Sequence, residues 1–587
     1  MNAKNEKVPD PKEIEKEISE FLSKKFGDNV KIVSPIVMPQ ESMLEKVQSP
    51  PHKEKTINFD LKPEELISYL DQYIIKQDQA KAILATKICT HFNRIKHTQT
   101  FPEALEGMVG SIKSNVLMVG PTGVGKTYMI KLIAKKIGVP FIKGDATKFS
   151  ETGYVGGDVE DLVRDLVREA DGDIKLAQNG IIYIDEIDKI ASSRNIIGAD
   201  VSRTGVQRAL LKPMEETEVD LKVPHDPISM LQEIERFRKT GKRDKTAVNT
   251  KNILFIMSGT FSDLSDIIKK RIKDQGIGFG AKISKGEDPS DILKHVKSED
   301  LIAFGFESEF VGRLPVKAVF ERLSENDLYE ILRNPNNPVI QGKKLDFAAY
   351  GIRLKFEDDA LHRLARQANS ENTGARGLVS AVEKALLPFE KKLPSTEMKR
   401  FSATAAVIDN PEGSLENLLA KPADNQLIVD FERLEDEEKN YIKKYISQNR
   451  KLLTEKYGLT LSPSRIEVVA EFYSRQILDV GNTIFKIKTY YDEIKKIELF
   501  FFKDHDINIV LEEDAIDHII AQVIREDVKL EDVYENLSKD FQHGLKLIQE
   551  KTGKNRFFLP KKALTHSEEY LSQLVKNEIG KRKSLTE

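Results

Sequence analysis

The residues best suited to chemistry form a glycine-rich octapeptide, GPTGVGKT, at positions 120–127. It fills every fixed position of the phosphate-binding pattern GxxxxGK[ST]. Glycines let backbone N–H groups curl around a phosphate without a Cβ clash, and a helix that begins there adds positive potential. Lys126 would reach the β- and γ-phosphates, and the Thr127 hydroxyl would bind Mg²⁺. The candidate phosphate loop consists of Gly120, Pro121, Thr122, Gly123, Val124, Gly125, Lys126 and Thr127.

A second motif, IIYIDE at 181–186, ends an apolar run with two acids. In a strand beside the phosphate loop, Asp185 would hold Mg²⁺, directly or through water. Glu186 would orient and polarise the attacking water. Two acids at a strand end are common, but after a complete phosphate loop they predict nucleotide hydrolysis.

The elements around these motifs alternate between short apolar strands and helical patterns. Strand–helix alternation with strands of the buried type is typical of a parallel sheet covered by helices on both faces. The expected strands lie within 114–120, 139–146, 179–188 and 251–260, and helices are expected at 128–137 and 158–170. Further along, 320–415 is mostly helical, with a short strand at 351–356 and a last strand around 405–408.

Composition limits the class of protein. The chain has 587 residues, enough for about four domains at roughly 150 residues each. With 40% hydrophobic and 32% charged residues it can form cores, which argues against wholesale disorder. Its net charge of −3 gives no overall electrostatic argument for binding nucleic acid.

Cys89 is the single cysteine, so the chain can form neither an intramolecular disulfide nor a cysteine-based zinc cluster. No apolar run approaches the roughly 20 residues that a membrane span needs. The charged N-terminus lacks the apolar core of a signal peptide. We therefore expect a soluble cytoplasmic protein with no membrane or zinc partner.

Further segments carry a resemblance to a known family. The segments are LDQYIIKQDQAK (70–81), GYVG (153–156), QGIGFGA (275–281), SEFVGRLPV (308–316) and TGARGL (373–378). Together with the two motifs above, they resemble the ClpX family of AAA+ unfoldases and, more loosely, its HslU relatives. The resemblance runs from about Leu61 to about Gly413, and it implies an ATPase that uses ATP and Mg²⁺.

The resemblance implies roles for residues around the nucleotide. Tyr73, Ile74 and Ile75 would pack against the adenine, although the family usually has Gly where this chain has Lys76. Arg313 would act as an arginine finger in the neighbouring subunit, and Arg376 would be the sensor-2 arginine on the small domain. The sensor-1 position falls on either Ser258 or Thr260.

The resemblance also implies partners. In a homohexamer, Tyr154 and Val155 between glycines would form a pore loop that grips protein substrates. Ile277, Gly278 and Phe279 match the tripeptide with which ClpX proteins dock on a ClpP-type peptidase. Physically, an apolar pair on a glycine-flexible loop among charged residues suits a hydrophobic pocket on a partner.

The chain departs from the family in three places. Residues 1–60 contain none of the cysteines of the family's zinc-binding N-domain, and they form a docking element or a mobile arm. Residues 220–245 replace the family's second pore loop and basic segment, and their middle has a helical pattern. Residues 416–587 are additional to the family.

The additional region contains a weak internal repeat. Residues 352–367 (IRLKFEDDALHRLARQ) align with 507–522 (INIVLEEDAIDHIIAQ). The repeat is either a degenerate second copy of the helical domain or a chance likeness between two strand–helix units. Because Glu531 stands where the offset places Arg376, and no phosphate loop accompanies it, this region should not bind nucleotide in the same way.

We therefore predict an α/β protein of four parts: an N-terminal helix and linker (1–60), a P-loop AAA+ large domain with a parallel sheet flanked by helices (61–319), a mainly helical small domain (320–415) and a mainly helical extension (416–587). The leading functional hypothesis is an ATP-driven unfoldase that serves a peptidase. The alternatives are a peptidase-independent chaperone or disassembly factor and, with less support, a nucleic-acid motor.

Overall fold

The computed structural model describes residues 60–101, 113–149, 158–191, 201–221, 247–275, 289–420, 425–526 and 528–583. The chain divides into two compact units. One takes in Met1–Leu66, Ala82–Val119 and Ile130–Val319, and the other takes in Ile67–Lys81, Gly120–Met129 and Phe320–Glu587. Each unit is described by itself.

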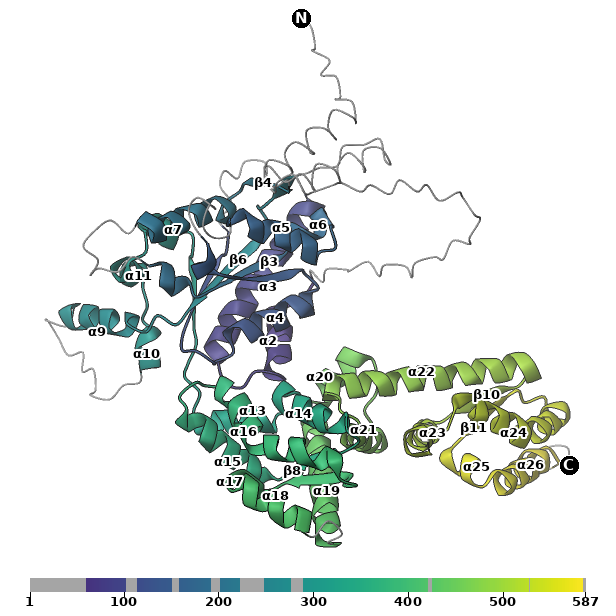
Figure 1. The fold of residues 1–587 in the computed structure, drawn as a ribbon. Helices are drawn as coiled ribbons and strands as arrows, with labels where there is room; N and C mark the ends of the chain where they lie inside the picture. Colours follow the sequence, from purple (N-terminus) through teal and green to yellow (C-terminus); the bar gives the residue numbers. More distant parts are fainter. Residues whose placement is uncertain are drawn as a thin grey trace, which may run out of the picture. The chain divides into compact units, whose positions relative to one another are not determined.

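The first unit is built on a five-stranded sheet with the order β2-β3-β6-β1-β7, in which every pair is parallel. Its strands are β1 (Val116–Val119), β2 (Phe141–Asp145), β3 (Ile181–Asp185), β6 (Leu254–Gly259) and β7 (Val316–Val319). Helices flank the sheet (Figure 1). The predicted parallel α/β sheet is confirmed, and its central strands β1, β3 and β6 are almost wholly buried, as expected for a sheet covered on both faces.

The helices of this part of the chain bury apolar stripes against the sheet. On α5, for example, Leu162, Val163, Leu166 and Val167 are buried at helical spacing. Cys89, in the middle of α3, is buried as well. The remaining elements are α2 (Pro63–Asp71), α3 (Asp78–Thr100), α4 (Lys126–Ile137), η2 (Ala146–Lys148), α5 (Glu160–Glu169), α6 (Ile174–Ala177), η3 (Ile187–Ile190), α7 (Val201–Met214), β4 (Glu218–Asp220), β5 (Ala247–Asn249), α9 (Leu264–Gln275), α10 (Pro289–Leu293), α11 (Ser298–Phe304) and α12 (Ser308–Gly312).

The second unit begins with a small helical domain around a two-stranded parallel sheet of β8 and β9. Its elements are α13 (Glu325–Arg333), α14 (Pro338–Ala348), β8 (Arg353–Phe356), α15 (Asp358–Ser370), α16 (Arg376–Lys392), η4 (Leu393–Ser395), β9 (Arg400–Ala403), α17 (Ala405–Asp409) and α18 (Pro411–Ala420).

The strand expected around 405–408 was misplaced. The strand is β9, and Ala405–Asp409 is helix α17. The Glu357 carboxylate accepts a hydrogen bond from the Ala405 backbone N–H at 2.9 Å. Thr404, directly before α17, is a residue type that often caps a helix, but its side chain forms no capping bond here. Glu357, which lies far away in the sequence, satisfies the helix start instead.

The C-terminal extension is mainly helical and has a core of its own, which includes Ile484, Phe501, Ile519, Phe541 and Phe557. Its elements are α19 (Asn425–Gln448), α20 (Arg450–Tyr457), α21 (Pro463–Arg475), α22 (Val480–His505), β10 (Asn508–Leu511), α23 (Glu513–Glu526), α24 (Leu530–Thr552), β11 (Arg556–Leu559), α25 (Lys561–Thr565) and α26 (Ser567–Lys583). The boundary expected at 416 falls inside α18.

The end of the extension has the same order of elements as the small domain. In both, two helices separate a pair of parallel strands, and two helices follow. The hydrogen bonds correspond too: Glu357 N–H donates to Ala403 O, and Glu512 N–H donates to Leu559 O, each at 3.0 Å. The likeness seen in the sequence therefore extends to topology.

Buried ion pairs join the extension to the small domain. Glu438 on α19 is paired with Lys344 on α14 and Lys355 on β8. Burial raises the pKa of Glu438, but the two lysines outweigh burial and bring it to about 2. Removing one member would leave an uncompensated buried charge, which costs about 3–5 kcal/mol. The pairs therefore hold α19 against the small domain.

Among the helices that the structure describes, none is long and apolar enough to cross a membrane.

Candidate nucleotide site

The phosphate loop follows β1, and α4 begins at Lys126. Three of its residues have positive φ: Gly120 at 154°, Gly123 at 74° and Gly125 at 92°. A Cβ on Gly125 would meet no atom within 4 Å, so the space beside this residue is open. The Lys126 ammonium donates to Gly120 O at 2.6 Å and to Pro121 O at 2.8 Å. This side chain lies along its own loop.

An apolar cavity of about 170 Å³ lies in the second unit beside this loop. It brings Tyr73, Ile74 and Ile75 together with Val124 and Gly125. These are residues that the sequence assigned to the adenine and to the phosphates. Its remaining lining residues are Tyr128, Leu323, Ile331, Asn334, Asn337, Pro338, Val339, Ala375 and Leu378, none of which the sequence analysis named.

Two of those missed residues, Asn334 and Asn337, come from the turn of residues 334–337, between α13 and α14. Asn337 caps α14 by accepting from Val339 N at 2.8 Å, and Pro338 takes the first helical position. The sequence NPNNP is typical of a turn. It carries no signal that the turn lines a pocket.

Lys76 occupies the position where the family usually has glycine, and its φ is 59°. This left-handed conformation disfavours residues with a Cβ. The Lys76 ammonium donates to Arg322 O at 2.8 Å and to the Asp327 carboxylate at 3.1 Å. The turn is thus retained with lysine, and the side chain forms anchoring contacts that glycine lacks.

The segment before α16 packs directly on the phosphate loop. Ala375 N–H donates to Gly123 O at 2.8 Å, and a Cβ on Gly123 would lie 2.1 Å from Thr373 O. Arg376 is exposed at the first residue of α16. Only glycine fits at position 123, because backbone from the small domain closes over it.

In the first unit, Asp185 ends β3 and is held by three groups. Its carboxylate is 2.7 Å from the Lys143 ammonium, and it accepts from the Ser258 hydroxyl at 3.0 Å and from Glu186 N–H at 3.1 Å. Burial alone would raise the pKa of Asp185, but Lys143 and Ser258 lower it below its ordinary value. The carboxylate is therefore ionised at neutral pH.

Glu186 follows in the left-handed region, with φ 58° and ψ 32°, and its side chain is exposed. A non-glycine residue in this region is strained, and such strain often accompanies a functional position. The backbone reversal takes the chain from β3 into η3 and leaves the Glu186 carboxylate in solvent.

The two sensor-1 candidates contact different acids. Ser258 donates to Asp185, whereas Thr260 donates to the buried Asp188 at 2.9 Å. Asp188 also accepts from Thr260 N and Phe261 N, so it fixes the loop after β6. The geometry assigns Ser258 to the acidic motif and Thr260 to the support of that loop.

Arg313 is half exposed and pairs with Glu215 in the same chain. Its backbone is fixed by Asn115, whose amide donates to Arg313 O at 3.2 Å and accepts from Phe255 N at 3.2 Å. Asn115, just before β1, is a buried positioning residue that the sequence analysis missed. The arginine side chain itself reaches solvent, and its role as an arginine finger stays a prediction.

The predicted pore-loop residues Tyr154 and Val155 and the predicted docking tripeptide Ile277, Gly278 and Phe279 lie outside the described residues. So does the segment 222–246. These assignments stay predictions.

Each unit, taken by itself, contains groups of the kind that bind a magnesium nucleotide. The Asp185 carboxylate and the Thr127 hydroxyl are oxygen donors of the kind that Mg²⁺ prefers. The loop has open space beside Gly125, and the apolar cavity suits a base. The described residues contain no cluster of three or more His, Cys, Asp or Glu side chains that would hold a metal by themselves.

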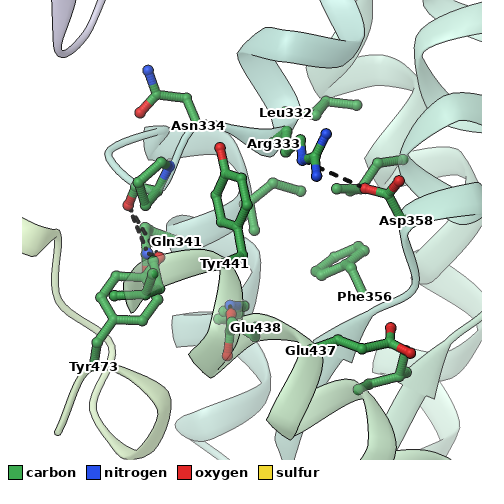
Figure 2. A pocket seen from close by; sticks show the side chains of 16 residues that line it. Leu332, Arg333, Asn334, Gln341, Phe356, Asp358, Glu437, Glu438, Tyr441 and Tyr473 are labelled. Atoms are coloured by element: carbon green, nitrogen blue, oxygen red, sulfur yellow. Dashed lines mark hydrogen bonds and ion pairs between the residues drawn. The ribbon is translucent and has the colours of Figure 1, made fainter. Parts of the chain in front are cut away.

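A second cavity, of about 300 Å³, lies between the small domain and α19 and α21 of the extension. Figure 2 shows its side chains, with Tyr473 next to Gln341 and the Arg333–Asp358 pair, 3.7 Å apart, on the other side. Asn334 lines both cavities. The turn at 334–337 therefore forms a wall between them.

Two family models match the chain. The model described as AAA domain (Cdc48 subfamily) matches residues 111–317. The model of the C-terminal, D2-small domain of ClpB protein matches residues 323–395. Residues 396–587 lie outside both.

Curated relatives are similar over more than half of the chain. The ATP-dependent Clp protease ATP-binding subunit ClpX of Treponema denticola is 42% identical over 342 residues, which are 58% of this chain and 79% of that protein. The proteins of the same name from Borrelia duttonii and Borrelia recurrentis are each 42% identical over 337 residues, 57% of this chain and 75% of theirs.

Proposed function

The chain belongs to the ClpX family of AAA+ ATPases, and from this membership we propose that it is an ATP-driven protein unfoldase. It would act as a homohexamer that threads substrates through an axial pore and delivers them to a ClpP-type peptidase. The observation that carries the proposal is the cavity that joins Tyr73, Ile74 and Ile75 to the phosphate loop. Sequence motifs alone do not show that the segment at residues 73–75 lies next to the phosphate loop.

Each residue would contribute one part of hydrolysis. Lys126 and the N–H groups of the phosphate loop bind the phosphates. Thr127 and Asp185 would hold Mg²⁺, which would supply positive charge to offset that of the phosphates. Glu186 takes a proton from the attacking water, and its exposure leaves room for that water. Arg313 stabilises charge in the site of the adjacent subunit.

Coupling to substrate movement would use the small domain. The backbone N–H of Ala375 donates to Gly123 O. A shift of the phosphate loop would therefore move the start of α16. Rotation of the small domain would move the pore-loop residues Tyr154 and Val155, which would grip substrate. Ile277, Gly278 and Phe279 would dock on the peptidase.

A peptidase-independent chaperone is the second candidate. The observation in its favour is the extension, which has its own core and lies outside both family models. A region of this size could serve a dedicated client.

The test is ATP-dependent degradation of an unfolded, tagged reporter by this chain mixed with the ClpP-type peptidase of its organism. We expect degradation by the wild type and its loss in both Tyr154→Ala and Phe279→Ala, with ATP hydrolysis retained by Phe279→Ala. ATP hydrolysis without degradation by the wild type would favour the chaperone. Tight, strongly salt-dependent binding of DNA or RNA would favour a nucleic-acid motor.

A further inference from the structure

The C-terminal extension forms hydrogen bonds with the turn at residues 334–337, on the side away from the nucleotide pocket. The Asn336 amide donates to the Tyr445 hydroxyl on α19 at 3.1 Å, and its oxygen accepts from Val480 N on α22 at 3.2 Å. On α21, the Tyr473 hydroxyl donates to Pro335 O at 3.1 Å. Three helices of the extension therefore hold one four-residue turn.

The same network reaches the segment expected to contact the adenine. The amides of Asn334 and Asn336 each donate to Gln72 O at 3.0 Å, and Gln72 directly precedes Tyr73. From α20, the Lys456 ammonium donates to the Gln72 side chain at 3.3 Å. The extension thus contacts both walls of the pocket, through Gln72 on one side and through the turn on the other.

These contacts lie beside a cavity. The 300 Å³ cavity is bounded by Asn334 and Pro335 of the turn and by Tyr441 and Tyr473 of the extension (Figure 2). Pro335, Asn336 and Asn337 are buried. Bonds within the small domain also hold the turn, from Gln341 Nε2 to Pro335 O at 3.2 Å and from Asn337 Nδ2 to Ile331 O at 2.6 Å. The cavity gives the turn space to shift when a bond from the extension is lost.

We propose that Tyr445 and Tyr473 of the extension are positioning residues for the nucleotide pocket of the same subunit. Their hydroxyls hold the turn at 334–337, which places Asn334 and Asn337 in the pocket wall and, through Asn336, fixes the carbonyl before Tyr73. The extension thereby sets nucleotide affinity. A ligand or partner that displaces α19 or α21 weakens nucleotide binding in cis, and bound nucleotide in turn stabilises the docked extension. This inference rests on the proposed nucleotide site.

The experiment uses full-length protein and compares Tyr445→Phe and Tyr473→Phe with wild type. Each variant deletes one hydroxyl and keeps the ring. Tyr445→Phe removes the bond from Asn336, whereas Tyr473→Phe removes both the bond to Pro335 O and the bond that the hydroxyl accepts from Gln341 Nε2 at 2.8 Å. We expect the Kd for a fluorescent ADP and the KM for ATP to rise about three- to tenfold, with kcat changed less than twofold. A merely structural loss would lower the active fraction, and hence kcat, and leave the KM unchanged.

The matched control is Tyr570→Phe. Its hydroxyl donates to Phe558 O at 2.8 Å within the repeat-like end of the extension, away from the turn. It should cost similar stability and leave the Kd for ADP unchanged. A Kd raised equally in Tyr570→Phe would overturn the proposal.

A double-substitution cycle tests the route. Because Tyr445 acts through Asn336, Tyr445→Phe should have no further effect on the Kd in an Asn336→Ala background. Additive effects would contradict this route.

Reciprocity gives a measurement that is independent of activity. Addition of ADP should slow amide hydrogen exchange in α19 and α21 of the wild type, and slow it less in Tyr445→Phe. Unchanged exchange on ADP addition would overturn the coupling.

Failure of this inference is distinguishable from failure of the proposed function. If the wild type binds ADP, Lys126→Ala does not, and both Tyr→Phe variants bind within twofold of wild type, the nucleotide site stands and the positioning role falls. If the wild type itself binds no nucleotide, both fall.

Discussion

The hydroxyl of Ser258 donates a hydrogen bond to the Asp185 carboxylate, with 3.0 Å between Oγ and Oδ1. The bond links β6 to β3 at the edge of the sheet where the acidic motif ends. Thr260, two residues later, is bonded to Asp188 instead. The two hydroxyls are therefore predicted to have different effects when removed.

Ser258→Ala should lower kcat for ATP hydrolysis about 10- to 100-fold with little change in the KM, because a hydrogen bond to a charged group contributes about 1.5–3 kcal/mol. Steady-state kinetics at saturating Mg²⁺ measure this. Thr260→Ala, as the matched variant, should chiefly lower the thermal unfolding temperature. A larger loss of kcat in Thr260→Ala would assign sensor 1 to Thr260.

Glu186→Gln and Arg313→Ala should each lower ATP turnover by about 10²-fold or more and retain ATP binding. Mixing the two inactive proteins should restore part of the turnover. In a mixed ring, an Arg313→Ala subunit with an intact Glu186 receives the arginine of a Glu186→Gln neighbour. Turnover that stays at the level of the separate variants would show that Arg313 acts within its own subunit.

Lys76→Gly should be more stable than Lys76→Ala by about 1 kcal/mol. Both variants lose the bonds to Arg322 O and Asp327, but only glycine relieves the strain of a φ of 59°. Thermal unfolding without nucleotide measures the difference. Equal stability of the two variants would mean that the turn rearranges when the lysine is lost.

His91 should make stability depend on pH. Burial lowers its pKa to about 4, although the bond from Nε2 to Asn252 O opposes this. Between about pH 6.5 and 4 the unfolded chain binds a proton that the folded chain does not. Unfolding should therefore become easier as pH falls, by about 1.4 kcal/mol per unit.

The comparison is with His91→Gln, which keeps a donor for Asn252 O and does not titrate. Its unfolding temperature should fall less than that of wild type from pH 6.5 to 5. Parallel curves for the two proteins would place the acid sensitivity elsewhere.

The family motifs were readable because each is contiguous: the phosphate loop, the IIYIDE strand and the segment at Tyr73 carry their signals within a few residues. The parallel sheet followed from buried apolar strands between helices. Asn115, Asn336 and Tyr445 were not readable, because their roles depend on partners far away in the sequence. The hydrogen bond between Asn336 and Tyr445 spans 109 positions. No local pattern announces such a contact.

The internal repeat also could not be established from the sequence alone. In the sequence, the match between Glu357 and Glu512 could have arisen by chance. In the structure, the backbone N–H of each of these residues donates to the equivalent strand, at Ala403 O and Leu559 O, so the two segments share a topology. A weak sequence signal gained meaning once strand pairing was known.

Cys89 makes the chain convenient for site-directed labelling. It is the chain's one cysteine, and burial, with a smaller contribution from Glu65, raises its pKa to about 11. Because the thiolate is the reactive form, the native thiol should be inert to maleimides at neutral pH and need not be removed. Cysteines introduced at exposed Glu169 and Glu397, one in each unit, can carry a donor and an acceptor dye. Single-molecule fluorescence can then follow how the separation of the two units changes during each round of ATP hydrolysis.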